Sequence, residues 1–330
     1  MNAFTIACLG KGGTGKTLVS TLLGRIARDQ GIRTLLVDAD PVGGLSMTCG
    51  IQGALTVAEA REQIIDRVKA LTPDSPPEET REIAEWMVAQ ALVERDGLAF
   101  LAMGQRRSLG CYCSLNLLLR KMIGAVVERF DLVVVDAEAG IEQVNREVVE
   151  RVDQALLLSD GSQRAVQTCL LVKDTIGRVP MMERCRMGVL FNRVAGVDEA
   201  HRKTLEQAGL SVVGVLPADD EVSKADRAGT TLQALGPQTA VYRMLAQALK
   251  GVGPIRSGPS PLPPPQTAGG GSLLLESTYV EALGTASSLL LRGFASIATP
   301  AETGWEGSAR CGRWYTPPDF ESALHSPSWR

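Results

Sequence analysis

Short apolar runs alternate with helix-periodic segments along most of this chain. The runs lie at 4–9, 34–37, 98–103, 132–135, 154–158, 187–191 and 212–215. Strands that are apolar throughout and rich in β-branched residues are typical of parallel sheets buried on both faces. The alternation of such runs with helical patterns therefore predicts an α/β fold, a three-layer sandwich with a mainly parallel central sheet.

Two segments depart from this alternation. An insert at 50–96 reads as two helices around a polar, proline-containing stretch at 72–79, and inserts of this kind carry partner contacts more often than chemistry. After residue 250 the chain becomes rich in Gly, Pro and Ser, contains no lysine, and has four prolines in five residues at 261–265. We expect one domain over 1–250 and a disordered tail over 251–330.

Composition narrows the functional classes. The chain is 45% hydrophobic and 22% charged, with a net charge of −3, as in ordinary globular proteins, and this argues weakly against nucleic acid as a partner. No apolar run reaches the ~18 residues of a membrane span. The amino terminus enters a predicted strand at once, so we expect no signal peptide and a cytoplasmic location. There the seven cysteines should stay reduced, and closely spaced cysteines indicate a metal site.

Residues 10–17 read Gly-Lys-Gly-Gly-Thr-Gly-Lys-Thr and fit the pattern G-x-x-x-x-G-K-[ST] between a predicted strand and a predicted helix. In that context the backbone N–H groups of Gly10, Lys11, Gly12, Gly13, Thr14 and Gly15 can surround a nucleotide phosphate at a helix N-terminus. We expect Lys16 to reach the β- and γ-phosphates, and the Thr17 hydroxyl to bind Mg²⁺. The pattern predicts a phosphate-binding loop.

Lys11 is the unusual residue of this loop. With it, the segment resembles the deviant Walker A motif K-G-G-x-G-K-T of the MinD/ParA/nitrogenase-iron-protein group of ATPases. The resemblance implies a P-loop NTPase fold, ATP with Mg²⁺ as cofactors, and an ATP-dependent homodimer in which Lys11 crosses to the nucleotide of the second subunit. A cation supplied in trans to the γ-phosphate can be worth ~10³–10⁵ in rate.

Carboxylates follow two further predicted strands. Asp38 and Asp40 end the second strand, where the same group has its switch I; Asp38 would lie near the magnesium shell and Asp40 would orient the attacking water. Asp136 ends the 132–135 strand and is typical of a Walker B aspartate that holds Mg²⁺ through water. Gly140, four residues on, completes a D-x-x-x-G switch II whose backbone N–H would approach the γ-phosphate.

Two strand ends would form the base-side loops. Asn192 and Arg193 end the 187–191 strand and resemble the adenine-reading segment of this group, because an amide can both donate to and accept from a purine edge. Pro217 follows the last strand and resembles the second base-side loop. These two assignments rest on less specific patterns than the phosphate loop does.

Cys111 and Cys113 form a Cys-x-Cys pair that precedes a helical run at 115–127. A helix N-terminus stabilises thiolates. Two ligands make a poor site for a thiophilic metal, but two copies across a two-fold interface would supply four. Such a site suits Zn²⁺, Ni²⁺ or an iron–sulfur cluster. We take Cys8, Cys49, Cys169 and Cys185 as structural, because none has a spaced partner.

The segment 103–120 together with 136–142 resembles the CooC-type maturation ATPases of carbon monoxide dehydrogenase, over about residues 1–250. The resemblance implies ATP-dependent nickel insertion into a client metalloenzyme, with Ni²⁺ or Zn²⁺ held at Cys111 and Cys113. Ser114 stands where that family has proline and Gln143 where it has histidine, which puts the client and the metal in question more than the ATPase.

Two alternatives stay open. The first is an iron–sulfur reductase like the nitrogenase iron protein, although its second cysteine lies far beyond the first and no cysteine occurs between Cys113 and Cys169 here. The second is a MinD/ParA-like positioning ATPase that binds DNA or membrane, for which the periodic segment 240–252 carries few basic residues. Neither DNA nor membrane explains the cysteine pair.

Overall fold

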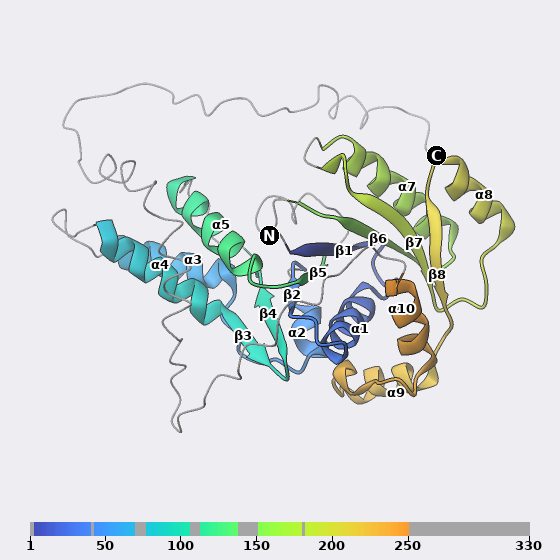
Figure 1. The fold of residues 1–330 in the computed structure, drawn as a ribbon, viewed down its shortest axis with the longest axis horizontal. Coiled ribbons are helices and arrows are strands. Elements are labelled where there is room, and N and C mark those ends of the chain that lie inside the picture. Colours follow the sequence, from blue (N-terminus) through green and yellow to red (C-terminus); the bar gives the residue numbers. More distant parts are fainter. Residues whose placement is uncertain are drawn as a thin grey trace, which may run out of the picture.

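A single twisted sheet organises the part of the chain that the structure describes, a computed structural model covering residues 3–40, 43–69, 77–105, 113–137, 151–179 and 182–250. The sheet has eight strands in the order β3-β4-β2-β5-β1-β6-β7-β8 (Figure 1). They are β1 (Phe4–Gly10), β2 (Thr34–Asp38), β3 (Leu92–Arg95), β4 (Leu98–Ala102), β5 (Leu132–Asp136), β6 (Gln154–Ser159), β7 (Arg186–Asn192) and β8 (Ser211–Leu216). The predicted α/β sandwich is confirmed; the predicted tail, 251–330, lies outside the described residues.

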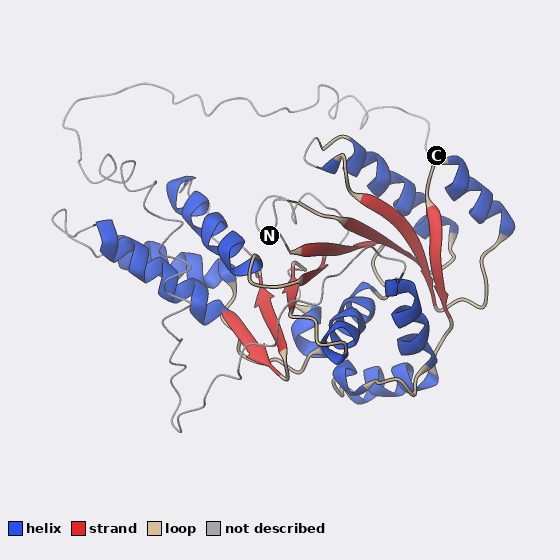
Figure 2. Cartoon of the chain, in the orientation of Figure 1, coloured by secondary structure: helices blue, strands red, loops and turns tan. Residues whose placement is uncertain are grey.

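Helices cover both faces of the sheet, because the strands alternate their apolar side chains between two cores (Figure 2). In β1, Ala7 and Leu9 belong to one core, and Ile6 and Cys8 to the other. One face packs against α1 (Lys16–Asp29), α2 (Gly44–Thr48) and α10 (Ala240–Lys250), with α9 (Asp220–Ala228) nearby. The opposite face packs against α7 (Gln163–Gly177) and α8 (Glu199–Gln207).

The insert forms the predicted pair of helices, α3 (Val57–Lys69) and α4 (Pro77–Ala91). They share a small separate core with α5 (Cys113–Val127), built around Ile64, Met87 and Met122. The insert also contains β3, a strand absent from the sequence prediction, which pairs antiparallel with β4. Asp96 and Gly97 join the two strands with positive φ angles of 51° and 75°. An Asp-Gly pair is a known hairpin signal, so β3 was predictable from its turn.

The helix after the phosphate loop packs closely on the sheet at a glycine. A Cβ atom added to Gly24 of α1 would come within 2.6 Å of a methyl group of Leu36 in β2. This glycine therefore lets α1 approach β2, and the approach places the N-terminus of α1 at the carboxyl ends of β1 and β5. By contrast, a Cβ added to Gly124 in α5 would meet nothing within 4 Å.

We predict opposite effects for the same substitution at these two glycines. Gly24→Ala should lower the free energy of unfolding by about 1–3 kcal/mol, because it overpacks the α1–β2 contact. Gly124→Ala should raise it by about 0.5–1 kcal/mol, because alanine favours helix and meets no neighbour. Urea unfolding of both variants measures the difference. Equal stabilisation by both substitutions would contradict the close approach of α1.

Candidate functional site

The loop between β1 and α1 is a compact turn shaped by glycines. Gly10 has φ +139°, and a Cβ added there would lie 2.5 Å from the Leu158 carbonyl oxygen in β6. Gly13 and Gly15 have φ angles of 80° and 92°. The Thr14 hydroxyl donates to the Lys11 carbonyl at 2.8 Å, which closes the turn. Larger residues at the left-handed positions would be strained, so the glycines are required by the shape of the loop itself.

Lys16 places its ammonium group within the curve of this loop. The side chain is only 9% exposed. Its Nζ donates to the carbonyl oxygens of Gly10 at 3.1 Å and Lys11 at 3.4 Å. No side chain caps the N-terminus of α1, which begins after Gly15. The first N–H groups of the helix and one ammonium group thus converge on the loop, which is the arrangement that binds nucleotide phosphates.

Two carboxylates lie side by side at the carboxyl edge of the sheet. Asp38 and Asp136 are paired residues of the parallel strands β2 and β5, and each is 1% exposed. Burial raises the pKa of Asp38 to about 7 and that of Asp136 to about 6. The negative charge of Asp136 adds to the increase at Asp38. A bound cation would offset the repulsion and the desolvation that these buried acids suffer.

The atoms around Asp136 fit a magnesium site. Its Oδ1 accepts a hydrogen bond from the Ser20 hydroxyl at 3.3 Å, and the Thr17 hydroxyl lies close enough to lower the pKa of this carboxyl. Its Oδ2 is buried and has no hydrogen-bond partner among the described residues. An orphaned carboxylate oxygen beside a threonine hydroxyl is the hard oxygen donor set that Mg²⁺ prefers. Thr17 and Asp136 would hold the ion, which would neutralise charge on the phosphates.

Asp38 organises the segment that carries Asp40. The Asp38 carboxylate accepts the backbone N–H groups of Leu45 at 3.1 Å and Ser46 at 3.2 Å, so it caps the short helix α2. It also accepts the N–H of Asp40 at 3.2 Å. Both aspartates line a cavity of about 220 Å³ together with small residues that include Gly43 and Gly104. The predicted switch I is therefore built around one buried carboxylate.

Two of the residues predicted to lie beside the base contact the phosphate loop. Asn192 is 1% exposed, and its Nδ2 donates to the Thr14 carbonyl oxygen at 2.8 Å, while its Oδ1 has no partner among the described residues. The Arg193 guanidinium donates to the Gly13 carbonyl oxygen, from a backbone with φ 60°. Pro217 follows β8, beside the end of β7. No contact of Pro217 with the loop is recorded among these residues.

Lys11 has an acidic partner within its own chain. Its Nζ lies 3.5 Å from Asp160, which follows β6, and the two side chains are 38% and 26% exposed. The pKa of Asp160 is lowered, first by its hydrogen bond from the Ser162 hydroxyl and also by Lys11. A half-exposed ion pair of this kind contributes little, about 0–1 kcal/mol. Lys11 can therefore exchange this carboxylate for another anion at small cost.

Only one of the two cysteines of the predicted metal site lies within the described residues. Cys113 is the first residue of α5, at the helix N-terminus as predicted, whereas Cys111 and Gly140 lie outside the described residues. The remaining cysteines of the described ranges, Cys8, Cys49, Cys169 and Cys185, are buried and form no disulfide there. Burial raises the pKa of Cys8 and Cys169 to about 12 and that of Cys185 to about 11. These thiols are packing residues.

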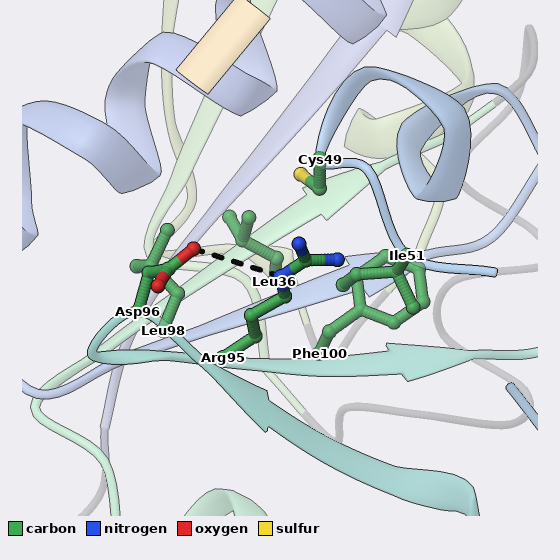
Figure 3. Close-up of a pocket in the computed structure, with 7 residues that line it drawn as sticks. All are labelled: Leu36, Cys49, Ile51, Arg95, Asp96, Leu98 and Phe100. Atoms are coloured by element: carbon green, nitrogen blue, oxygen red, sulfur yellow. Dashed lines mark ion pairs between the residues drawn. The ribbon is translucent and has the colours of Figure 1, made fainter. Parts of the chain in front are cut away.

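A second, smaller pocket lies beneath the loop that follows α2 (Figure 3). Arg95 extends into it from β3 and donates to the Gly50 carbonyl oxygen. Its guanidinium is also 3.6 Å from Asp96. Leu36, Leu98 and Phe100 form the apolar floor. The hydrogen bond from Arg95 therefore ties the loop after α2 to β3, and the described residues that line this pocket offer no convergent polar groups for a ligand.

The comparisons with known proteins agree with this geometry. Residues 5–232 match the family model described as the CobQ/CobB/MinD/ParA nucleotide binding domain. The chain belongs to this family. Among curated proteins, the chain is similar to an uncharacterized ATP-binding protein of Methanocaldococcus jannaschii, 30% identical over 73% of this chain and 95% of that protein. The carbon monoxide dehydrogenase accessory protein CooC of Rhodospirillum rubrum is 28% identical over 76% of this chain and 97% of its own length.

A solved structure supports the fold. The septum site-determining protein MinD of Pyrococcus horikoshii, complexed with Mg-ADP, superimposes with a TM-score of 0.52 over 76% of this chain and 96% of MinD, at 14% identity. By its family model and its phosphate loop, the protein is a P-loop ATPase of the MinD/ParA family. No described helix is long and apolar enough to cross a membrane.

The structure brings together most of the residues singled out from the sequence. The phosphate loop, Asp38, Asp136 and Asn192 meet at one edge of the sheet. Ser20 and Asp160 also belong to this site but were missed. Asp160 carried a signal, because it directly follows a strand next to β1, where such sheets bind ligands. Ser20 carried none, because a serine inside an amphipathic helix is ordinary. No group of three metal-binding side chains occurs within the described ranges.

Replacing the loop lysine tests the phosphate site. Lys16→Ala should abolish detectable ATP binding, because it removes the ammonium group that the loop curves around, a charged contact worth about 1.5–3 kcal/mol or more. Isothermal titration with Mg-ATP measures the loss. Normal ATP affinity in the variant would refute the assignment of this loop.

The raised pKa of Asp136 predicts that its ionised carboxylate destabilises the folded protein when no magnesium is bound. Because this pKa is raised from 3.8 to about 6, the folded state binds the proton more tightly, and stability falls as pH rises through that window. Asp136→Asn removes the buried charge. Without Mg²⁺ at pH 8, the variant should melt about 2–4 °C higher than the parent, the shift that ~1 kcal/mol gives in a domain of this size.

The same variant should lose Mg²⁺-dependent hydrolysis. At pH 5, inside this window, the difference in melting temperature should fall to roughly half, and it should vanish only below the unfolded pKa of 3.8, where the carboxyl is protonated in both states. Scanning calorimetry at both pH values and a phosphate-release assay provide the measurements. A variant that melts below the parent at both pH values by the same amount would mean that the ionised carboxylate carries no such cost.

Proposed function

We propose that this protein is a homodimeric, ATP-dependent metallochaperone that binds Ni²⁺ or Zn²⁺ through Cys111 and Cys113 of both subunits and delivers nickel to a metalloenzyme. The client would be an enzyme like carbon monoxide dehydrogenase. The full-length similarity to CooC supports this choice, since the accessory protein is matched over 97% of its length. The domain would comprise residues 1–250, and its work would take place in the cytoplasm, where thiolates stay reduced.

The observation that carries the proposal is a backbone link between switch I and the cysteine segment. The N–H of Met103, after β4, donates to the Asp38 carbonyl oxygen at 2.8 Å, and the Met103 carbonyl accepts from Ala58 at 3.0 Å. Gly104 follows with φ +68°, and a Cβ there would lie 2.5 Å from the Thr56 hydroxyl oxygen. The chain that leads to Cys111 thus starts from a point fixed to the switch.

Through this link, a change in the bound nucleotide would be passed to the proposed metal site. Asp38 caps α2, lies next to Asp136 and joins the end of β4, so a shift of the switch on γ-phosphate binding would move the cysteine segment. Asp40, beside the same cavity, would orient the attacking water, and the Gly140 N–H would approach the γ-phosphate. Order or register changes of this kind are the usual output of γ-phosphate sensing.

Dimerisation would use the exchangeable pair of Lys11 and Asp160. In the proposed dimer, Lys11 leaves Asp160 and contacts the nucleotide of the other subunit, where it stabilises charge developing on the γ-phosphate. Each Cys-x-Cys pair would then meet its symmetry mate and complete a four-thiolate site. Adenine would be read by Asn192 through its unpartnered Oδ1, with Arg193 and Pro217 flanking the base.

The alternative functions find less support. A reductase of the nitrogenase-iron-protein type needs a second exposed cysteine, yet Cys169 and Cys185 are buried thiols. A membrane-positioning ATPase needs an unpacked amphipathic helix near the end of the domain. The apolar side of α10, including Val241, Leu245 and Leu249, is buried in the core against α1 and β8. That helix is therefore committed to the fold.

Metal binding by a cysteine variant tests the proposal. Anaerobically purified protein is titrated with Ni²⁺ and Zn²⁺ in competition with a chromogenic chelator, in the presence of a non-hydrolysable ATP analogue. Cys111→Ala should abolish tight binding and weaken dimerisation while ATP binding is kept, because the site loses a thiolate from each subunit.

Cys185→Ala provides the matched control. This thiol is buried at the start of β7 and away from the nucleotide, so its removal should leave metal stoichiometry unchanged. Full metal occupancy in Cys111→Ala would contradict the interfacial site. Equal loss in both variants would mean that the metal is held by other groups.

A further inference from the structure

Ser20 occupies a position in the magnesium site that its sequence context gave no reason to expect. It lies in α1 four residues after Lys16 and three after Thr17, so all three project from the same side of the helix. Its side chain is 0% exposed. A fully buried hydroxyl needs a partner, and this one lies 3.3 Å from Asp136 Oδ1.

We propose that Ser20 is a positioning residue for magnesium, which holds Asp136 so that Oδ2 faces the ion. The rest of the geometry supports this role. Asp136 Oδ2 is buried and has no partner among the described residues, whereas Oδ1 is occupied by Ser20. A carboxylate can rotate about its terminal bond, and a hydrogen bond to one oxygen fixes the direction of the other.

A neighbouring thiol offers a control for this arrangement. Cys8 is the paired residue of Asp136 in the parallel strands β1 and β5, and it is fully buried. Cys8 is thus a second buried group beside Asp136, but the hydrogen bond to Asp136 Oδ1 comes from Ser20.

Binding of Mn²⁺, used as a magnesium substitute, tests the proposal apart from catalysis. The Mn²⁺ affinity of the protein–ADP complex is measured by electron paramagnetic resonance of free and bound ion. Ser20→Ala should weaken Mn²⁺ binding about 10-fold, within the range of 10–100-fold that loss of an outer hydrogen bond costs a metal site. Binding of ADP without metal should be unchanged.

Two further variants separate positioning from packing. Cys8→Ala removes a buried group from the same cluster but leaves the Ser20–Asp136 bond, so its Mn²⁺ affinity should match that of the parent. Ser20→Thr keeps the hydroxyl and should restore most of the affinity that Ser20→Ala loses. Unchanged affinity in Ser20→Ala, or an equal loss in Cys8→Ala, would overturn the proposal. If Ser20→Thr does not fold, the comparison of the two alanine variants decides.

Discussion

The site depends on two buried carboxylates that parallel strand pairing forces together. Asp38 and Asp136 end adjacent strands in register, and both are almost fully buried, so ionising them costs the fold stability. Each has a compensating hydrogen bond: Asp38 accepts from the N-terminus of α2, and Asp136 accepts from the Ser20 hydroxyl. The uncompensated remainder is what a magnesium ion would neutralise. Magnesium binding and the stability of the fold therefore both depend on the same two buried charges.

Asp38 and Asp136 are connected both to the phosphate loop and to the segment that leads to the cysteines. Toward the phosphate loop, α1 carries Lys16, Thr17 and Ser20 from a helix that Gly24 allows close to the sheet. Toward the cysteines, the carbonyl of Asp38 holds Met103 and hence the start of the segment that leads to α5. In the proposed mechanism, this backbone hydrogen bond would pass a change at the γ-phosphate to the segment that leads to Cys111.

Much of this could be predicted from the sequence, for identifiable reasons. Buried strands such as β1 and β5 were evident because both of their faces are apolar, and the phosphate loop because its glycines are dictated by backbone geometry. β3 was missed because a four-residue, half-exposed edge strand has no clear periodicity, although Asp96-Gly97 marked its turn. Ser20 could not be found from pattern alone, since its role comes from a contact between distant parts of the chain, whereas Asp160 was marked only by its place directly after a strand. The roles of Cys111, Gly140 and the tail remain predictions.

The central claim is that ATP binding and metal capture occur in one dimer. The most direct measurement is native mass spectrometry with metal analysis of the anaerobically purified full chain, with ADP and with a non-hydrolysable ATP analogue. The account predicts a dimer carrying a single Ni²⁺ or Zn²⁺ ion with the analogue, and loss of that ion with ADP. A dimer that forms with the analogue but holds no metal would contradict it, and iron with sulfide in that dimer would move the protein to the reductase class.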